Sequence, residues 1–148
     1  YAQAWRTHFA MEHDPTGLFC EANVFRYRPL ARIVIRHGPA TDPQALTPAL
    51  QAAQVVGEQV LDSDATREPD HELADQLAHL GASQIRAVDV TEEDLLRTVA
   101  ADTGVHVATE PVVPVGLVEL LHLVREQAVS TTLHRFGNLT PNQRPASA

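Results

Sequence analysis

The sequence predicts an α/β domain in which a mostly parallel sheet carries helices on both faces. Three observations predict this class. Through the middle of the chain, short apolar runs typical of strands alternate with segments whose apolar residues recur at helical spacing. Helix start and stop residues stand at the junctions, and the connections are short. Alternating strands and helices of this kind require right-handed crossovers, which place parallel strands side by side.

The first part of the chain predicts one helix followed by two strands. Aromatic residues recur at helical spacing in residues 2–12, which indicates a short amphipathic helix. Residues 18–28 and 31–36 are typical of β-segments. Pro29 between them predicts a bend or a sheet edge, because proline cannot donate to a ladder. The second segment contains three consecutive apolar residues, Ile33 to Ile35, which indicates a buried strand.

Helix and strand signals then alternate three times. Asp42 before Pro43 predicts an N-cap followed by proline in the first turn, and Asp70 predicts a second cap. Thr91 with Asp94 approximates a capping box for a third helix. Each helix is expected to stop at a glycine that precedes a strand: Gly57 before Val60-Leu61, Gly81 before Ile85 to Val90, and Gly104 before Val105 to Val107.

The last part predicts a short helix, a strand and an unstructured end. Residues 118–124 fit a short helix, and residues 126–137 alternate as a strand does. Together with the earlier elements they give a Rossmann-like layer with a β-segment at each end of the chain. We therefore predict a single domain over residues 1–138 and a disordered tail over residues 139–148.

Length and composition limit the class of protein. A chain of 148 residues with 44% hydrophobic residues is long enough for one core and too short for two ordinary domains. Cys20 is the only cysteine, so no disulfide can form within the chain. No apolar run approaches the roughly 20 residues that cross a bilayer, and no secretory leader is evident. These features predict a cytoplasmic protein, and the start at Tyr1 predicts a piece of a longer polypeptide.

Charge is distributed unevenly along a chain whose net formal charge is −8. Residues 1–36 hold five arginines against three acids, whereas residues 37–110 hold three arginines against fourteen acids. The acidic middle argues against a nucleic-acid partner, because neutralising phosphates requires a basic face. The chain has no lysine, so its basic groups other than histidine are guanidinium groups, which suit planar pairing with carboxylates.

The junction after the buried strand lacks the features of a phosphate-binding loop. A dinucleotide fingerprint needs several glycines there, because the backbone must turn tightly and approach the pyrophosphate at a helix N-terminus. Residues 36–44 read RHGPATDPQ, with a single glycine and with prolines at 39 and 43. Proline lacks the N–H donor that phosphate would use. The sequence therefore predicts no cofactor bound by this chain.

The remaining polar residues offer no nucleophile or metal site. Cys20 stands beside Glu21, and a neighbouring carboxylate disfavours the reactive thiolate. The eight histidines form no HExxH motif, and only His8 and His13 lie at short spacing. The acids at 92–94 suit the first turn of a helix, where they complement the helix dipole. We expect neither a catalytic residue nor a metal ligand in this chain.

Two long segments at the ends of the chain carry a family resemblance. They are residues 14–29, DPTGLFCEANVFRYRP, and residues 118–138, VELLHLVREQAVSTTLHRFGN. Both resemble the C-terminal end of bifunctional proline dehydrogenase/L-glutamate-γ-semialdehyde dehydrogenases in their long actinobacterial-type form. The middle alternates as expected, so the resemblance covers residues 1–138. Residues 20–23, CEAN, depart from the Gly-Glu-Arg-Asn of the related catalytic domains by lacking the arginine.

The resemblance implies a place in proline catabolism and no activity of this chain itself. Members of the family oxidise proline to glutamate through pyrroline-5-carboxylate, with FAD in one domain and NAD in an aldehyde dehydrogenase domain. In long members an extra C-terminal domain is similar to a degenerate aldehyde dehydrogenase nucleotide-binding fold and covers the aldehyde site or the substrate tunnel. The implied partner is therefore the upstream aldehyde dehydrogenase domain of the same polypeptide. FAD and NAD would be bound by that parent enzyme.

Charged residues of the two end segments are the candidates for contacting such a partner. In an extended segment Arg26 and Arg28 share one face, opposite Phe25 and Tyr27. Two interpretations stay open for these arginines: local pairing with acids such as Glu21, or docking of the domain onto the rest of the enzyme. The candidate docking residues are Glu21, Arg26, Arg28, Arg125, Glu126 and Arg135.

An alternative function of a different class also stays open. The fold class would suit a free-standing α/β module that binds a small nucleotide and regulates another protein. Saturable micromolar binding of NAD or ATP by the isolated chain would favour that alternative. Either function is compatible with a homo-oligomer.

Overall fold

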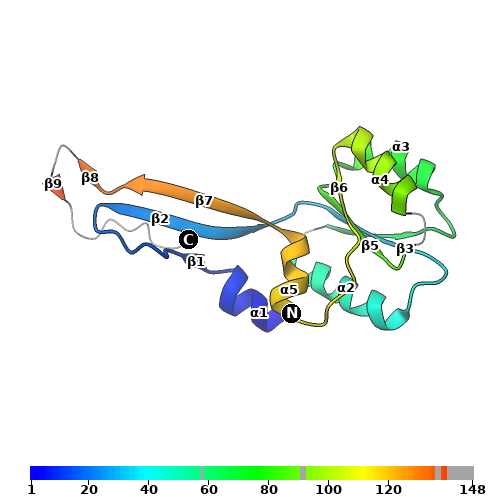
Figure 1. The fold of residues 1–148 in the computed structure, drawn as a ribbon, viewed down its shortest axis with the longest axis horizontal. Helices are drawn as coiled ribbons and strands as arrows, with labels where there is room; N and C mark the ends of the chain where they lie inside the picture. The colour runs from blue at the N-terminus through cyan, green and yellow to red at the C-terminus, as the bar shows by residue number, and fades with distance from the viewer. Residues whose placement is uncertain (58, 91–92, 136–137, 140–148) are drawn as a thin grey trace.

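The computed structural model describes residues 1–57, 59–90, 93–135 and 138–139. Its elements form a helix-covered sheet and an elongated β-ribbon (Figure 1). The helices are α1 (Ala2–Ala4), the π-helix η1 (Trp5–Phe9), α2 (Pro43–Val56), α3 (Asp70–Leu80), α4 (Glu93–Thr103), α5 (Gly116–Glu119) and the 3-10 helix η2 (Leu120–Leu123). The strands are β1 (Glu12–His13), β2 (Glu21–Pro29), β3 (Ile33–His37), β4 (Val60–Asp64), β5 (Gln84–Val88), β6 (His106–Ala108), β7 (Val124–Thr132), β8 (His134–Arg135) and β9 (Asn138–Leu139).

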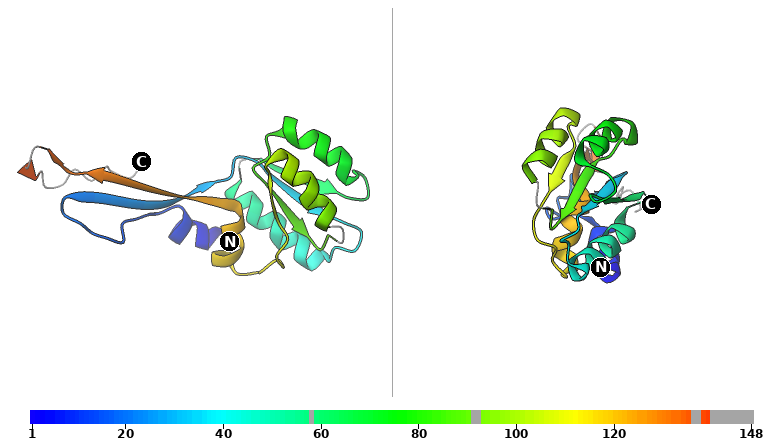
Figure 2. Two further views of the ribbon diagram at one scale, coloured as in Figure 1. Left: turned by 45° about the horizontal axis from the view of Figure 1, so that its top comes forward. Right: turned by 90° about the vertical axis from the view of Figure 1, so that its right-hand side faces the viewer.

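A four-stranded sheet with the order β4-β3-β5-β6 forms the body of the molecule. Each neighbouring pair in it is parallel. α2 covers one face of the sheet, and α3 with α4 covers the other (Figures 1 and 2). The predicted Rossmann-like layer with helices on both faces is therefore confirmed.

Alternation along β3 divides the core between these two faces. Ile33 and Ile35 pack with residues of α2, whereas Val34 packs beneath α3 and α4. All three side chains are almost completely buried, as expected for a strand covered on both faces. Burying each such side chain contributes about 1.5–3 kcal/mol of hydrophobic stabilisation.

Local signals set the ends of two helices as predicted. The Asp42 carboxylate accepts a hydrogen bond from the backbone N–H of Gln44 at 2.8 Å, and Pro43 begins α2. Gly81 ends α3 in the left-handed conformation with φ of +61°, which glycine adopts without a Cβ clash. The short strand expected at Val60-Leu61 is the start of β4.

The two end segments of the chain pair with each other in an antiparallel ribbon, which we call the arm. Its strand order is β1-β2-β7. β2 and β7 pair along nine residues, from Glu21 opposite Thr132 to Pro29 opposite Val124. The arm extends away from the sheet, and β8 and β9 pair at its far end (Figures 1 and 2). The sequence predicted a β-segment at each end but not their pairing.

Two predictions near helix ends were wrong. The helix expected over residues 2–12 stops at Phe9, because Glu12 and His13 pair with β2 as β1. Asp70 is the first residue of α3 and does not cap it, since its carboxylate pairs with Arg36 instead.

The end of the chain also differs from its prediction. The helix expected over residues 118–124 starts at Gly116 and ends as η2, so β7 begins at Val124 and stops at Thr132. Leu139 belongs to β9, although the tail was expected to be disordered from this residue onward. Thr91, an expected cap, and residues 140–148 lie outside the described residues.

β4 ends at an acid, Asp64, whose ionisation is tied to folding. Oδ1 of Asp64 accepts hydrogen bonds from the Thr66 hydroxyl at 2.7 Å and from the Thr66 backbone N–H at 2.9 Å. These bonds favour the carboxylate and hold the pKa of Asp64 below its ordinary value. The stabilisation is therefore present above the unfolded-state pKa of about 3.9 and is lost as pH falls through the folded-state pKa.

We expect Thr66→Val to raise the pKa of Asp64, because the hydroxyl hydrogen bond is the largest cause of the lowering. NMR titration of the Asp64 carboxyl carbon measures the change. Thr66→Ser keeps a hydroxyl and serves as the control. An unchanged pKa in the valine variant would contradict this assignment.

Candidate docking surface

Pairing between β2 and β7 sorts the candidate docking residues onto two faces of the arm. Successive side chains alternate between the faces, and directly paired residues share one. The basic face carries Arg26, Arg28, Arg125 and Gln127, and the aromatic face carries Glu21, Phe25, Tyr27 and Glu126. The structure thus brings the three arginines together and places the two acids on the opposite face. The side chain of Arg135 lies outside the described residues.

The aromatic face holds the arm against the N-terminal helix. The Tyr27 ring lies 4.7 Å from the ring of Phe9 and 5.5 Å from that of His8, measured between centroids. Phe25 meets Tyr27 edge to face at 5.1 Å. Phe9 is buried in the core cluster that also contains α2 residues. These contacts fix the arm near its junction with the sheet.

Arg26 on the basic face is paired locally. Its Nη1 lies 2.8 Å from a carboxylate oxygen of Glu12, and its Nε donates to the side-chain oxygen of Gln127 at 2.7 Å. Glu21, the acid considered as a local partner, instead accepts a hydrogen bond from Asn23 at 3.4 Å. Local pairing therefore describes Arg26, with an acid from β1.

Arg28 and Arg125 lie directly opposite each other in the ladder. Both are exposed, and in the part of the chain that the structure describes no acid pairs with either of them. Arg28 contacts the Gln127 side chain at 3.3 Å. Like charges directly opposite each other destabilise an antiparallel pair. A carboxylate from a partner would relieve this repulsion, which favours the docking interpretation for these two residues.

The other two arginines of the segment stabilise the sheet. Arg32 donates from Nε to the side-chain oxygen of Gln59 at 2.6 Å. Arg36 is fully buried and pairs with Asp70. The four arginines between residues 26 and 36 therefore do not act as one group.

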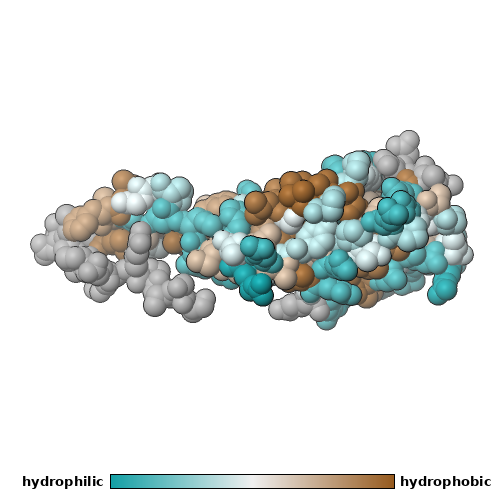
Figure 3. Space-filling model, turned by 90° about the horizontal axis from the view of Figure 1, so that it is seen from below, coloured by the Kyte–Doolittle hydropathy of each residue, from teal (hydrophilic) through white to brown (hydrophobic). Residues whose placement is uncertain are grey.

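Large apolar side chains are exposed in two places. On the arm they are Met11, Leu18, Phe19 and Val129, and on the segment that includes α5 they are Val115, Leu117, Val118 and Leu121. Figure 3 shows one apolar area toward the far end of the arm and a second area where the arm meets the sheet, in the region of α5. Exposed apolar patches with polar surroundings mark protein interaction sites.

A buried ion pair holds α5 in place beneath its exposed residues. Arg86 donates from Nε and Nη2 to the two carboxylate oxygens of Glu119, at 2.9 and 3.2 Å. Both side chains are completely buried. Glu119 also accepts from the backbone N–H of Val113 at 3.0 Å, and Arg86 donates to the carbonyl of Glu110 at 2.6 Å. Neither Arg86 nor Glu119 was predicted from the sequence to have a role.

β7 leaves one backbone edge open. It pairs with β2 on one side, and no strand among the described residues pairs with it on the other. An unpaired edge presents N–H and C=O groups to which an extended partner segment can add. The open edge continues directly from η2, so it adjoins the apolar residues around α5.

Comparison with solved structures identifies a relative of both parts of the molecule. Over 91% of its length the chain matches the structure of proline utilization A (PutA) from Corynebacterium freiburgense, with 38% identity and a TM-score of 0.68. The chain is a PutA-related domain. It spans 13% of that PutA chain. No protein-family model and no curated protein sequence matches it.

The match to PutA is extensive enough to include the arm as well as the sheet, and it agrees with the resemblance seen in the end segments.

Cys20, the lone thiol, precedes β2 on the arm, and its carbonyl accepts from the Leu133 N–H at 2.8 Å. Among the described residues no group of three or more potential ligands could hold a metal ion. Within the same residues, no helix has the length and apolar character needed to span a bilayer.

Proposed function

We propose that this chain is a non-catalytic domain of a bifunctional proline-catabolic enzyme that covers or stabilises the aldehyde dehydrogenase site or the substrate tunnel. The similarity to PutA supports the proline-catabolic setting. The proposed partner is the upstream aldehyde dehydrogenase domain of the same polypeptide, which acts on the semialdehyde derived from pyrroline-5-carboxylate. FAD and NAD would bind to other parts of that cytoplasmic enzyme.

The opposed pair Arg28 and Arg125 carries this proposal. Their repulsion costs free energy in the isolated chain, and an acidic surface on a partner would convert it into two charge-assisted contacts. The open edge of β7 offers backbone hydrogen bonds beside them. Exposed Phe19 and Leu18 add apolar area that a partner would remove from water. Charge, edge and apolar area thus lie on one extended element.

Covering the aldehyde route would retain a reactive intermediate. An aldehyde that escapes from the enzyme must be recaptured from dilute solution, whereas a closed passage delivers it directly to the second site. Excluding water also suppresses side reactions of the intermediate. A domain that acts in this way needs shape and contact surface but no reactive group.

Deleting residues 1–138 from the complete enzyme tests the function. We expect coupled proline-to-glutamate turnover to develop a lag in NADH formation, with the intermediate accessible to an added aldehyde-trapping amine. The separate proline oxidation step should keep its rate, because the domain supplies none of its chemistry. Unchanged channelling kinetics after the deletion would rule the proposal out.

The charge reversal Arg28→Glu with Arg125→Glu tests the surface without removing the domain. Close charge pairs across an interface are coupled by about 1.5 kcal/mol or more, so docking should weaken at least about tenfold. The same lag should therefore appear. Arg67→Glu is the matched control, since Arg67 is 87% exposed on the turn after β4. A lag in the control, or none in the double variant, would exclude this surface.

A further inference from the structure

A cavity of about 400 Å³ opens at the carboxyl ends of β3, β4 and β5. The chain leaves β3 for α2 on one face of the sheet and leaves β5 for α4 on the other. Adjacent parallel strands whose connections go to opposite faces leave a crevice, the usual ligand position in open α/β sheets. The volume falls within the range of about 300–1,000 Å³ found for small-molecule sites. We call this cavity the crevice.

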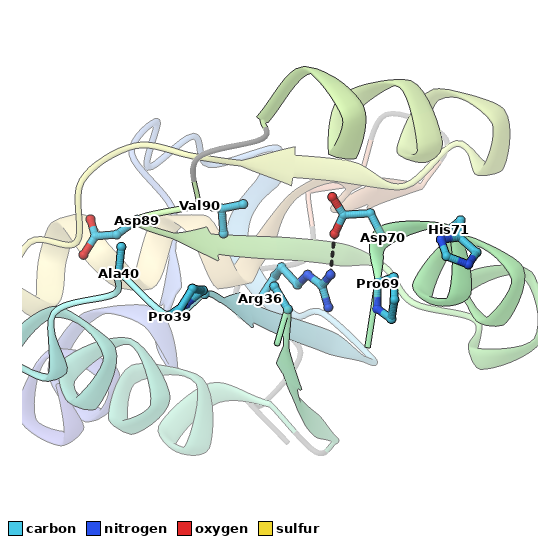
Figure 4. A pocket seen from close by; sticks show the side chains of 10 residues that line it. Arg36, Pro39, Ala40, Pro69, Asp70, His71, Asp89 and Val90 are labelled. Carbon is cyan, nitrogen blue, oxygen red and sulfur yellow. Dashed lines mark hydrogen bonds and ion pairs between the residues drawn. The ribbon is translucent and has the colours of Figure 1, made fainter. Parts of the chain in front are cut away.

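The buried guanidinium of Arg36 lies at the wall of the crevice (Figure 4). Its Nη1 donates to the Ser63 hydroxyl at 2.8 Å, and its Nη2 donates to the carbonyl of Glu68 at 2.7 Å and to the Asp70 carboxylate. Its Nε is buried and has no hydrogen-bond partner among the described residues. Leaving a buried donor unpaired costs about 1–3 kcal/mol, so the folded chain gains if a ligand oxygen reaches this N–H.

The charge around Arg36 selects against an anionic ligand. Asp70 pairs with Arg36, and a carboxylate oxygen of Glu68 lies 3.5 Å from it. Asp89, with a left-handed φ of 49°, also lines the crevice. Two carboxylates therefore flank the guanidinium, and a third lines the crevice away from it (Figure 4). A phosphate or carboxylate would be repelled, whereas a hydroxyl can accept from Nε–H and donate to a carboxylate.

Apart from the exposed His71, the rest of the wall is small and apolar. Pro39 and Ala40 follow β3, Pro69 precedes α3, and Val90 follows β5. In Figure 4, Val90 and Pro39 lie on one side of Arg36, and Asp70 lies on the other side, next to the guanidinium. Such a wall suits the flat apolar faces of a heterocycle, and the polar end suits hydroxyl groups.

NAD does not fit these residues. The connection between β3 and α2 has one glycine, and Pro39 and Pro43 remove N–H donors that a pyrophosphate would need. The surrounding carboxylates add repulsion toward phosphate. The crevice thus retains the position of a nucleotide site without its phosphate-binding elements.

We propose that the crevice binds an uncharged ribonucleoside. The ribose hydroxyls contact the Nε–H of Arg36 and the carboxylate of Asp70, and the base packs against Pro39 and Val90. This function is independent of docking through the arm, because the crevice residues lie at the opposite end of β3 from the strand's junction with the arm.

Titration of the 148-residue chain with adenosine, guanosine, cytidine and uridine tests the proposal, with amide chemical shifts as the readout. We expect at least one of them to give a saturable change that maps to the loops after β3, β4 and β5. The 2′-deoxy form of that nucleoside should bind about tenfold more weakly, since it loses a hydrogen bond to a charged group. Its 5′-monophosphate should also bind more weakly.

Two variants of matched size locate the site. Ala40→Trp fills the crevice from an exposed loop position and should reduce affinity at least about tenfold, whereas Ala101→Trp on the exposed side of α4 should leave it unchanged. The proposal is overturned if none of the four nucleosides gives a saturable shift. Tighter binding of the monophosphate, or unchanged affinity in Ala40→Trp, overturns it equally. Channelling by the complete enzyme is measured separately, so failure of one proposal leaves the other standing.

Discussion

Glu119→Gln is expected to lower the free energy of unfolding by about 3–5 kcal/mol, the range found when one partner of a buried ion pair is removed. The variant keeps the size of the side chain but leaves the charge of Arg86 without a counterion at a site with no exposed surface. The guanidinium cannot lose its proton to escape the cost, because arginine stays protonated in proteins. Urea denaturation of the 148-residue chain measures the loss.

Two further variants separate the buried charge from the rest of the network. Arg86→Met with Glu119→Leu removes both charges and should recover part of the loss. Recovery should stay incomplete, because the backbone N–H of Val113 and the carbonyl of Glu110 lose their partners. Glu12→Gln is the control, since its pair with Arg26 is partly exposed and should be worth about 1 kcal/mol or less. A loss below that value for Glu119→Gln would contradict the assigned role.

The network also connects stability to the docking surface. Glu119 belongs to α5, whose neighbours Leu117 and Val118 are exposed. The Tyr1 hydroxyl donates to the carbonyl of Val113 at 3.2 Å, and burial, with the nearby Glu119 carboxylate, raises the pKa of Tyr1. Replacing Glu119 should therefore destabilise the packing of the N-terminal helix and of the end of the arm that adjoins the sheet.

Elements fixed by short-range chemistry could be predicted from the sequence. The cap at Asp42 and the left-handed stop at Gly81 each depend on a few neighbouring residues, and both were found where expected. Patterning also gave the parallel layer, because the run from Ile33 to Ile35 requires cover on both faces. These features set the fold class and most of the helix and strand positions.

Features that depend on distant partners could not be predicted. β2 and β7 pair across about a hundred residues, and neither segment carries a local signal for the other. Aspartate is a residue type that often caps helices, but the carboxylate of Asp70 pairs with the buried Arg36 of β3 instead. Arg86 offered the best missed signal: an arginine within an apolar strand must find a counterion, although the sequence does not say which acid supplies it.

The candidate docking residues illustrate the same limit. Alternation correctly placed Arg26 and Arg28 on one face opposite Tyr27, because side-chain period follows from the backbone alone. It could not show that Arg125 would join them, since that depends on the register between two remote strands. The register between β2 and β7 is what places Arg28 directly opposite Arg125.

Arg36→Met is expected to lower the free energy of unfolding by about 3–5 kcal/mol, because it also removes one partner of a buried ion pair. Here the charge left unpaired is a carboxylate. Arg36 is fully buried, and its loss leaves the buried Asp70 carboxylate without its cation. Ser63 and the carbonyl of Glu68 lose a donor as well. The effect should be somewhat smaller than for Glu119→Gln, because Asp70 and Glu68 retain 8% and 23% exposure and can recover some hydration.

Matched variants distinguish this cost from the loss of a long side chain. Arg32→Met makes the same replacement four residues earlier, where the arginine bonds to the exposed Gln59, and should cost about 1 kcal/mol or less. Adding Asp70→Asn to Arg36→Met should restore part of the stability, because the uncompensated charge is then gone. If urea denaturation shows the same loss of unfolding free energy for Arg36→Met and Arg32→Met, the buried ion pair does not stabilise the packing of β3 against α3.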